Sequence, residues 1–452
     1  MSQQVLSIIV LALIVLVATI RSVNMGAVAF LGAFLVGTLI FHESKDDIFS
    51  GFPGDLFVVL VGVTLLFAIA KANGTVDWLI HMGVRAVKGR IAFIPWVMFL
   101  VTSLLTMVGA VVPGAVAIMA PVGMTFAVRH RINPMLMGLL IINGASAGGF
   151  SPIGVFGVIT NGVVERSGLP GNPILLWVSS FLFNALLSVV VFLLFGGREL
   201  LSRRAEVVEG VTLDPDPEPD PEPAPEPEPA GAGSGGAAVT TRPATTIAAT
   251  GITTLNPQRV ATLAGLLVLV AGALVFDIDV GLLALSIATV ICLLFPAGAK
   301  AAVAEVAWPT VLLIAGVVTY VSMMDREGTI TMLGDSVANI GVALLAAFVI
   351  CLIGGAVSAF ASTTGILGAL IPLAVPFLLT GQVGAVGLII ALAISSSVVD
   401  SSPFSTSGAL TVASSPEDVR DRVFRGLMVW GLCMIIVAPV LAWTIFVLPG
   451  WL

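Results

Sequence analysis

The chain has 452 residues, of which 58% are hydrophobic and only 10% are charged, and its mean hydropathy is +1.12. These values exclude an ordinary soluble domain, and several apolar runs reach the roughly 20 residues that span a bilayer. The net charge of −7 resides in the seven acidic residues of the tract 214–228, so no basic surface for a nucleic acid is implied.

The first half, residues 1–197, predicts a membrane repeat of five spans. The spans are expected at 5–21, 24–41, 55–71, 135–165 and 174–196. An amphipathic segment at 75–90 suits the membrane interface, and a re-entrant hairpin of two half-helices is expected at 95–127. The span 135–165 is expected to break at 148–152, where two glycines precede Ser151 and Pro152.

Residues 198–257 differ in composition from the rest of the chain. Asp-Pro and Glu-Pro units alternate there, and a Gly/Ser/Ala/Thr-rich run follows them. Proline favours extended polyproline geometry, and a segment of this composition cannot bury a core. The sequence therefore predicts a disordered linker between two membrane repeats.

The second half, residues 258–452, predicts the same order of elements. Spans are expected at 258–275, 278–296, 309–326, 385–413 and 423–448, with an interfacial segment at 329–341 and a hairpin at 345–380. An offset of 251 residues places Pro121 under Pro372 and Ser151-Pro152 under Ser402-Pro403. One offset holds across both segments, which indicates an internal duplication.

An odd number of spans in each half gives the two repeats opposite orientations. In this topology all but three of the nineteen Lys and Arg residues, namely Lys45, Arg166 and Arg326, lie on the linker side. Because positive charge accumulates on the cytoplasmic side, we expect a cytoplasmic linker and both termini outside the cell membrane. The fold class expected is an all-α polytopic membrane protein of two inverted repeats, which is typical of secondary transporters.

Four helix breaks are expected to meet near the middle of the membrane, at 109–114, 148–152, 362–365 and 400–405. Helix ends placed there attract anions, and free carbonyls and hydroxyls coordinate small cations. Asp400 is the one acidic residue that we place deep in the membrane, where such residues are functional by default. Because no Lys or Arg lies near a break, an anionic substrate is expected to travel with a cation.

Structural roles compete with functional ones at several positions. Small and hydroxylated residues usually pack membrane helices, and we assign Ser405, Thr406 and Ser407 to packing. Asn143 suits a helix contact as well as a site. The three cysteines are scattered in apolar runs and form neither a disulfide pattern nor a metal site. An intramembrane hydrolase is disfavoured, since no His lies near the membrane centre and neither a Gly-x-Ser-x-Gly nor a His-Glu-x-x-His motif occurs. A channel is a further alternative.

At this point the sequence resembles a known group of transporters. Ser362-Thr363-Thr364 followed by Pro372 is similar to the Ser-Asn-Thr…Pro motif of the divalent-anion/sodium symporters, within the wider ion-transporter superfamily. The runs 398–410 (VVDSSPFSTSGAL) and 107–123 (MVGAVVPGAVAIMAPVG) more closely resemble the malonate/dicarboxylate carriers of the MatC-like branch. Thr363 stands where the motif has Asn, and Val111-Val112-Pro113 stands where a second Ser-Asn-Thr would be expected.

The resemblance implies a homodimeric, elevator-type transporter of small dicarboxylates that is coupled to sodium. It implies that Ser362, Thr363 and Thr364 contact the substrate carboxylate and one sodium, with Ser402-Pro403 and Ser151-Pro152 at the partner breaks. Taken together with the four breaks and their polar residues, it leads us to expect substrate contacts at Ser362, Thr363, Thr364, Ser402, Pro403, Ser151, Pro152, Val112, Pro113 and Asn143. Cation contacts are expected at Ser358, Ser362, Thr363, Ser397, Asp400, Ser401, Gly148 and Ser146.

We therefore expect a secondary active transporter of a malonate- or succinate-like dicarboxylate, with no cofactor and no enzymatic activity. Asp400 suits either a cation ligand or a proton carrier, so Na⁺ and H⁺ are both open as the coupling ion. The alternative is an exchange or efflux permease of the same superfamily for another anion.

Overall fold

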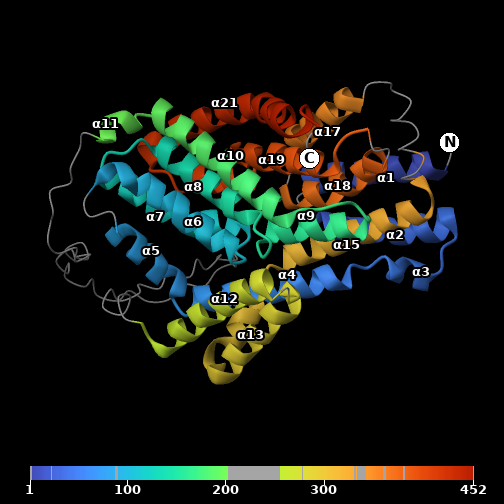
Figure 1. Ribbon diagram of the computed structural model, residues 1–452, viewed down its shortest axis with the longest axis horizontal. Helices are drawn as coiled ribbons and strands as arrows, with labels where there is room; N and C mark the ends of the chain where they lie inside the picture. The colour runs from blue at the N-terminus through green and yellow to red at the C-terminus, as the bar shows by residue number, and fades with distance from the viewer. Residues whose placement is uncertain are drawn as a thin grey trace, which may run out of the picture.

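The computed structural model describes residues 3–21, 23–86, 90–201, 255–276, 278–329, 332, 343–359, 363–379 and 382–450. Within these ranges the regular elements are helices and none is a β-strand, in agreement with an all-α fold (Figure 1). Most of the expected linker and most of the second interfacial segment, together with Ser362, lie outside the described residues.

The first half of the chain forms eleven helices among the described residues, in the expected order. They are α1 (Gln3–Arg21), α2 (Met25–Val36, continued by a π-helical turn to Phe41), α3 (Lys45–Ser50), α4 (Gly54–Ala72), α5 (Thr75–Ala86), α6 (Ile94–Met107), α7 (Val112–Arg129), α8 (Pro134–Gly149), α9 (Val155–Arg166), α10 (Pro173–Leu194) and α11 (Gly197–Leu201).

The second half follows with helices at corresponding places. They are α12 (Pro257–Val275), α13 (Val280–Leu294), α14 (Ala299–Ala304), α15 (Trp308–Arg326), α17 (Ala343–Ser358), α18 (Thr363–Leu379), α19 (Ala385–Val398), α20 (Thr406–Ala413) and α21 (Glu417–Ala442, continued by a π-helical turn to Val447). Helices α7, α8 and α9 begin 251 residues before α18, α19 and α20. In Figure 1, α6 and α7 lie toward the end of the molecule that carries α11, and α17 and α18 toward the end that carries the N-terminus.

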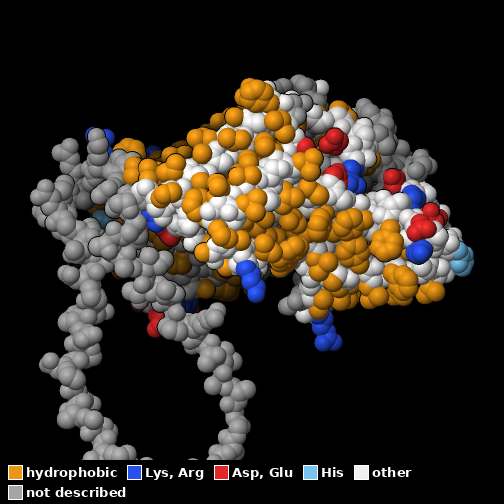
Figure 2. All heavy atoms as spheres, turned by 90° about the horizontal axis from the view of Figure 1, so that it is seen from below, with side chains coloured by type: hydrophobic (Ala, Val, Ile, Leu, Met, Phe, Trp, Pro, Cys, Tyr) orange, Lys and Arg blue, Asp and Glu red, His pale blue; other side chains and the backbone are white. Residues whose placement is uncertain are grey.

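Several helices are apolar and long enough to cross a bilayer. Six candidate spans are found among the described residues, in α4, α7, α10, α15, α19 with α20, and α21. A seventh arises if α13 and α14, which are bent by 109°, count as one span. Helix α7 meets the criterion although its sequence predicts one arm of a re-entrant hairpin, and that hairpin stays a prediction. Apolar side chains cover much of the face drawn in Figure 2. The chain is a multi-pass membrane protein.

Local sequence explains where many of these helices begin and end. Asn133, Asn172 and Asn256 each precede a proline, and their side chains accept hydrogen bonds from the first turns of α8, α10 and α12. Proline suits the first helical position because its missing N–H has no partner there in any case. Proline also stops α8 and α19, since Pro152 and Pro403 follow their last residues closely and cannot continue a helical ladder.

The two halves are joined by two helix crossings at glycines. Gly26 of α2 lies on the backbone of α15, where a Cβ on Gly316 would overlap the Gly26 carbonyl oxygen. Gly62 of α4 faces α13, where a Cβ on Gly62 would lie 2.8 Å from the Gly281 carbonyl oxygen. Small residues allow this close approach between membrane helices. Each half therefore contributes one helix to each crossing.

Two short helices were not anticipated from hydropathy. Helix α3 starts at a capping box, in which Ser44 and Asp47 bond each other's backbone and side chain. Its counterpart α14 lies at the corresponding place in the second half. Both are six residues long, which is too short for a search for spans to find them.

Candidate functional site

The α8–α9 break of the first half is packed against α6 and the α6–α7 turn of the same half. Helix α6 ends at Met107, and the chain turns through Gly109, whose φ of +110° favours glycine. The Ser151 hydroxyl donates to the Met107 carbonyl oxygen at 2.7 Å, which ties the α8–α9 break to the α6–α7 turn. A Cβ on Gly148 would overlap the Ser103 carbonyl oxygen, so α8 and α6 also meet there backbone to backbone.

The break in the second half holds a buried carboxylate. Helix α19 ends at Val398, a 3₁₀ turn covers Val399–Ser401, and α20 begins at Thr406. Asp400 lies in this turn, with 3% of its surface exposed. Ser407, at the start of α20, donates its hydroxyl to Oδ2 of Asp400 at 2.7 Å. Ser405 donates to the Asp400 carbonyl oxygen at 2.5 Å and to the Ser402 carbonyl oxygen at 2.7 Å. Ser405 and Ser407, which we assign to packing, thus contact Asp400.

The first residue of α18 reaches the same carboxylate. Thr363, the first residue of α18, also interacts through its hydroxyl with the side chain of Asp400. The hydroxyls of Thr363 and Ser358 lie 2.9 Å apart, so a continuous polar chain runs from the end of α17 to α20. We name the set Ser358, Thr363, Asp400 and Ser407 the carboxylate cluster.

The carboxylate cluster contains no positively charged group that could balance the charge of Asp400. The partners found for the Asp400 carboxylate are hydroxyl groups, and none of them carries a positive charge. Ionising a buried carboxylate without a counter-charge is costly, even when hydroxyls donate to it. A small cation or a proton offsets this cost, and carboxylate and hydroxyl oxygens are ligands that hard monovalent and divalent cations accept. The cluster can therefore bind a cation or carry a proton.

Most of the expected site residues that the structure describes around the two breaks are buried, Pro113 and Pro152 are partly buried, and several already have hydrogen-bond partners. Ser397 and Ser401 donate to carbonyl oxygens three residues earlier, and the Ser402 hydroxyl accepts from the backbone of Phe404. Thr364 and Pro403 are buried near the start of α18 and at the α19–α20 break. Val112 and Pro113 form the first turn of α7, and Pro152 follows Ser151 at the first break.

Asn143 contacts a neighbouring helix. Its amide donates to the Ser188 hydroxyl of α10 at 3.1 Å, and both residues are buried. Ser180 and Asn184 lie on the same helix at four-residue spacing, and each has a buried oxygen without a hydrogen-bond partner in the structure. This polar face of α10 was missed from the sequence, although the spacing Ser180, Asn184, Ser188 is its signal. Ser146 of α8 also has a buried hydroxyl without a partner.

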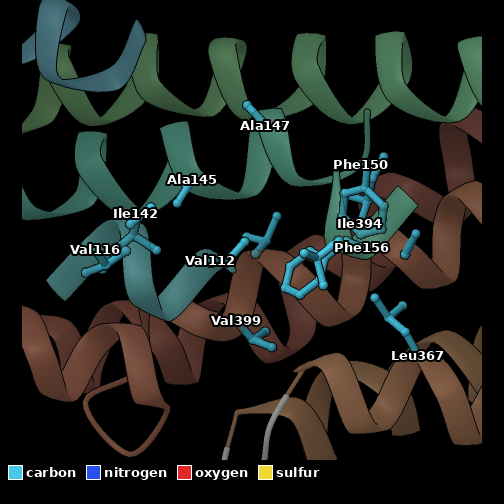
Figure 3. Close-up of a cluster of buried hydrophobic side chains, with 14 of the residues drawn as sticks. Val112, Val116, Ile142, Ala145, Ala147, Phe150, Phe156, Leu367, Ile394 and Val399 are labelled. Carbon is cyan, nitrogen blue, oxygen red and sulfur yellow. The ribbon is translucent and has the colours of Figure 1, made fainter. Parts of the chain in front are cut away.

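Between the two breaks lies a group of apolar side chains, which we name the central apolar cluster. It consists of Val112, Phe150, Phe156, Leu367, Ile394 and Val399. All six side chains are at most 1% exposed. Figure 3 shows them between α7, α8 and α9 of the first half and α18 and α19 of the second. The breaks of both halves therefore border one packed region, and that region is apolar.

No group of three or more His, Cys, Asp or Glu side chains that could hold a metal ion is found among the residues that the structure describes. The carboxylate cluster contains a single acidic residue, and its other oxygen donors are neutral. Such a donor set fits a monovalent cation or a proton better than a resident transition metal.

The comparisons with known proteins agree with transport. Residues 1–149 match the family model described as the N-terminus of the dicarboxylate carrier protein MatC. The matched segment ends at the last residue of α8, directly before the first break. No curated protein matches the chain. The similarity is thus to a transporter and not to an enzyme, and it supports a dicarboxylate carrier.

Proposed function

We propose that this chain is a secondary active transporter of a small dicarboxylate of the malonate or succinate class. The observation that carries the proposal is Asp400, a buried carboxylate that hydroxyls of two separate segments contact at a break between helices. An acidic residue is retained at such a place when a cation or proton binds with it. The match of residues 1–149 to a dicarboxylate carrier supports the substrate class.

In this proposal Na⁺ or H⁺ binds at the carboxylate cluster together with the substrate carboxylate. Thr363 and Thr364 stand at the start of α18, where free backbone N–H groups and the helix dipole favour an anion, and Ser362 directly precedes them in the sequence. A bound cation neutralises Asp400 and allows a second negative charge nearby. Cation and substrate then stabilise each other's binding, which is the requirement for symport.

Alternating access follows from the arrangement that we propose for the two halves. The proposed architecture is a pair of inverted repeats, each with a re-entrant hairpin, in a homodimer that works by an elevator motion. The 251-residue offset between α7–α9 and α18–α20 supports the duplication, and the opposite ends occupied by the two hairpins in Figure 1 support the inversion. The linker is then cytoplasmic and both termini are outside.

Reconstituted protein tests the proposal directly. Labelled malonate or succinate is offered to proteoliposomes under an imposed Na⁺ gradient, an imposed pH gradient, or neither. We expect concentrative uptake under one of the two gradients and none without a gradient. Uptake that equilibrates equally under all three conditions would indicate a channel or a uniporter and contradict the proposal.

A further inference from the structure

The two breaks carry opposite side-chain chemistry at corresponding positions. At the offset of 251 residues, each member of the carboxylate cluster, and Ser401 beside it, has an apolar counterpart or a glycine in the first half. Ser358, Thr363, Asp400, Ser401 and Ser407 correspond to Met107, Val112, Gly149, Phe150 and Phe156. Three of these counterparts belong to the central apolar cluster.

The two breaks differ in their side chains although their backbones form the same hydrogen bonds. In the first half, Ser151 N donates to Gly148 O at 3.0 Å, and Gly154 N donates to Ser151 O at 2.9 Å. In the second half, Ser402 N donates to Val399 O at 2.9 Å and Ser405 N to Ser402 O at 3.0 Å. Donors and acceptors correspond at the same offset. The path of the chain is therefore shared by the two breaks, and only the side chains decide what each break can bind.

The first break has no acidic side chain, and apolar side chains pack around Gly149, although the buried hydroxyl of Ser146 on α8 has no hydrogen-bond partner. A Cβ on Gly149, the counterpart of Asp400, would lie 3.1 Å from Cγ2 of Val112 and 3.2 Å from Cδ2 of Phe156. The rings of Phe150 and Phe156 pack with their centroids 5.3 Å apart. The Ser151 hydroxyl there is already bonded to Met107.

We propose that the substrate site is one-sided. The second half binds one ionised carboxylate and one coupling cation or proton, and the first half offers an apolar wall of Val112, Phe150 and Phe156. The inference rests on the transport function proposed above and specifies the substrate of the same site.

A one-sided site selects the charge state of its substrate. A second carboxylate that faced Val112, Phe150 and Phe156 would lose its water without gaining a partner, which is costly for a charge. The site therefore takes a monoanion with a short apolar remainder. A dicarboxylate enters with its second carboxyl group protonated, and a short monocarboxylate or a dicarboxylate monoester fits equally well. A single coupling ion accompanies the substrate, because only the second break has a carboxylate to bind one.

Competition for uptake of labelled succinate into proteoliposomes, at fixed pH 7.5 and under the gradient that drives uptake, tests this inference. Monomethyl succinate cannot become a dianion, whereas succinate at this pH is almost wholly dianionic. We expect monomethyl succinate to inhibit at a concentration at least about tenfold lower than unlabelled succinate, since the uncompensated second charge is excluded. Butyrate is expected to inhibit as well. Inhibition by succinate alone, with neither monoanion active, would overturn the one-sided site.

Two substitutions test which residues cause the preference for monomethyl succinate over succinate. Val112→Thr gives the first break the side chain of Thr363 with little change in volume, and it should lower the preference for monomethyl succinate over succinate by about fivefold, the effect of one hydrogen bond. Thr363→Val should weaken inhibition by both compounds equally. Val128→Thr, at the exposed end of α7, is the matched control and should change neither.

The outcomes separate the inference from the function on which it rests. Gradient-driven succinate uptake without inhibition by monoanions leaves the transporter in place and removes the one-sided site. If neither dicarboxylates nor monocarboxylates are taken up under a gradient, the proposed transport function and the one-sided site are both contradicted. An unchanged preference in Val112→Thr, in protein that retains normal uptake, would also contradict the apolar wall.

Discussion

Gly26 of α2 and Gly316 of α15 lie backbone against backbone, although 290 residues separate them in the chain. Gly281 and Gly62, their counterparts in the internal duplication that we propose, form the matching contact between α13 and α4. Each of the four glycines therefore contacts a glycine of the other half, Gly26 with Gly316 and Gly62 with Gly281. Since each crossing needs one helix from each half, the packing of these helices requires both halves of the chain.

The first prediction concerns this crossing. Gly316→Ala should lower the thermal stability of the detergent-solubilised protein, because the added Cβ meets the backbone of Gly26 and not a side chain that could move. Overpacking of this kind typically costs about 1–3 kcal/mol. Gly298→Ala is the control, since nothing lies within 4 Å of a Cβ at that position. Thermal unfolding followed by tryptophan fluorescence measures both, and equal stability of the two variants would show that the α2–α15 contact is looser than described.

The second prediction concerns the coupling ion. Asp400→Asn retains an oxygen that accepts from Ser407 but removes the charge. We expect it to abolish uptake driven by the coupling gradient, whereas counterflow exchange of preloaded substrate continues, because exchange requires only a loaded site that reorients. Asp46→Asn, at an exposed residue of α3, is the matched control.

The dependence of the uptake rate on the concentration of the coupling ion is a second test of the role of Asp400. Uptake by the unsubstituted protein should rise hyperbolically with the ion, with a Hill coefficient of about one, since one carboxylate cluster is available. Normal concentrative uptake by Asp400→Asn under both gradients would show that Asp400 is a packing residue and would leave coupling to hydroxyls and backbone carbonyls.

The third prediction decides between site and scaffold for Asn143. Its contact with Ser188 favours a scaffold role, and Asn143→Ala should destabilise the protein by about 1–3 kcal/mol, the cost of a buried polar group that loses its partner. Ser188→Ala combined with Asn143→Ala should cost less than the sum of the two single changes. KM for succinate should stay within about twofold throughout. A large change in KM at unchanged stability would place Asn143 in the substrate site instead.

The fourth prediction concerns the orientation of the two hairpins. Arg131 and Gln382 are corresponding exposed residues, which follow α7 and α18, the second helices of the two proposed hairpins. In a background without native cysteines, Arg131→Cys should react with an impermeant thiol reagent from the cytoplasmic side and Gln382→Cys from the outside. Labelling of both from one side of the membrane would contradict the inverted repeat and with it the mechanism proposed for alternating access.

The positions of the helices were largely predictable from the sequence. Hydropathy and prolines place the ends of α4, α8 and α19 within about two residues of the structure, because an apolar run and a following helix breaker define a helix without reference to tertiary contacts. The same reasoning singled out Asp400, since an acidic residue in an apolar run is conspicuous. Helices α3 and α14 were missed, because helices of six residues are too short to give a signal in a search for membrane spans.

The partners of the site residues could not be predicted in the same way. Ser407 and Ser405 resemble ordinary packing residues in the sequence, and only the 3₁₀ turn at Val399–Ser401 brings them to Asp400. The contact between Asn143 and Ser188 depends on how α8 and α10 rotate about their axes, which helical periodicity alone does not determine. The sequence identifies which groups are polar, and the fold determines which of them meet.

The shared backbone of the two breaks has a consequence for how such a carrier changes over time. Because the chain already follows the same path at 148–158 as at 399–409, a new ion-binding arrangement in the first half needs altered side chains and no rearranged loop. In the ion-coupled transport that we propose, the number of ions moved with each substrate is therefore a property that a few nucleotide changes can alter, while the backbone path shared by the two breaks is left as it is.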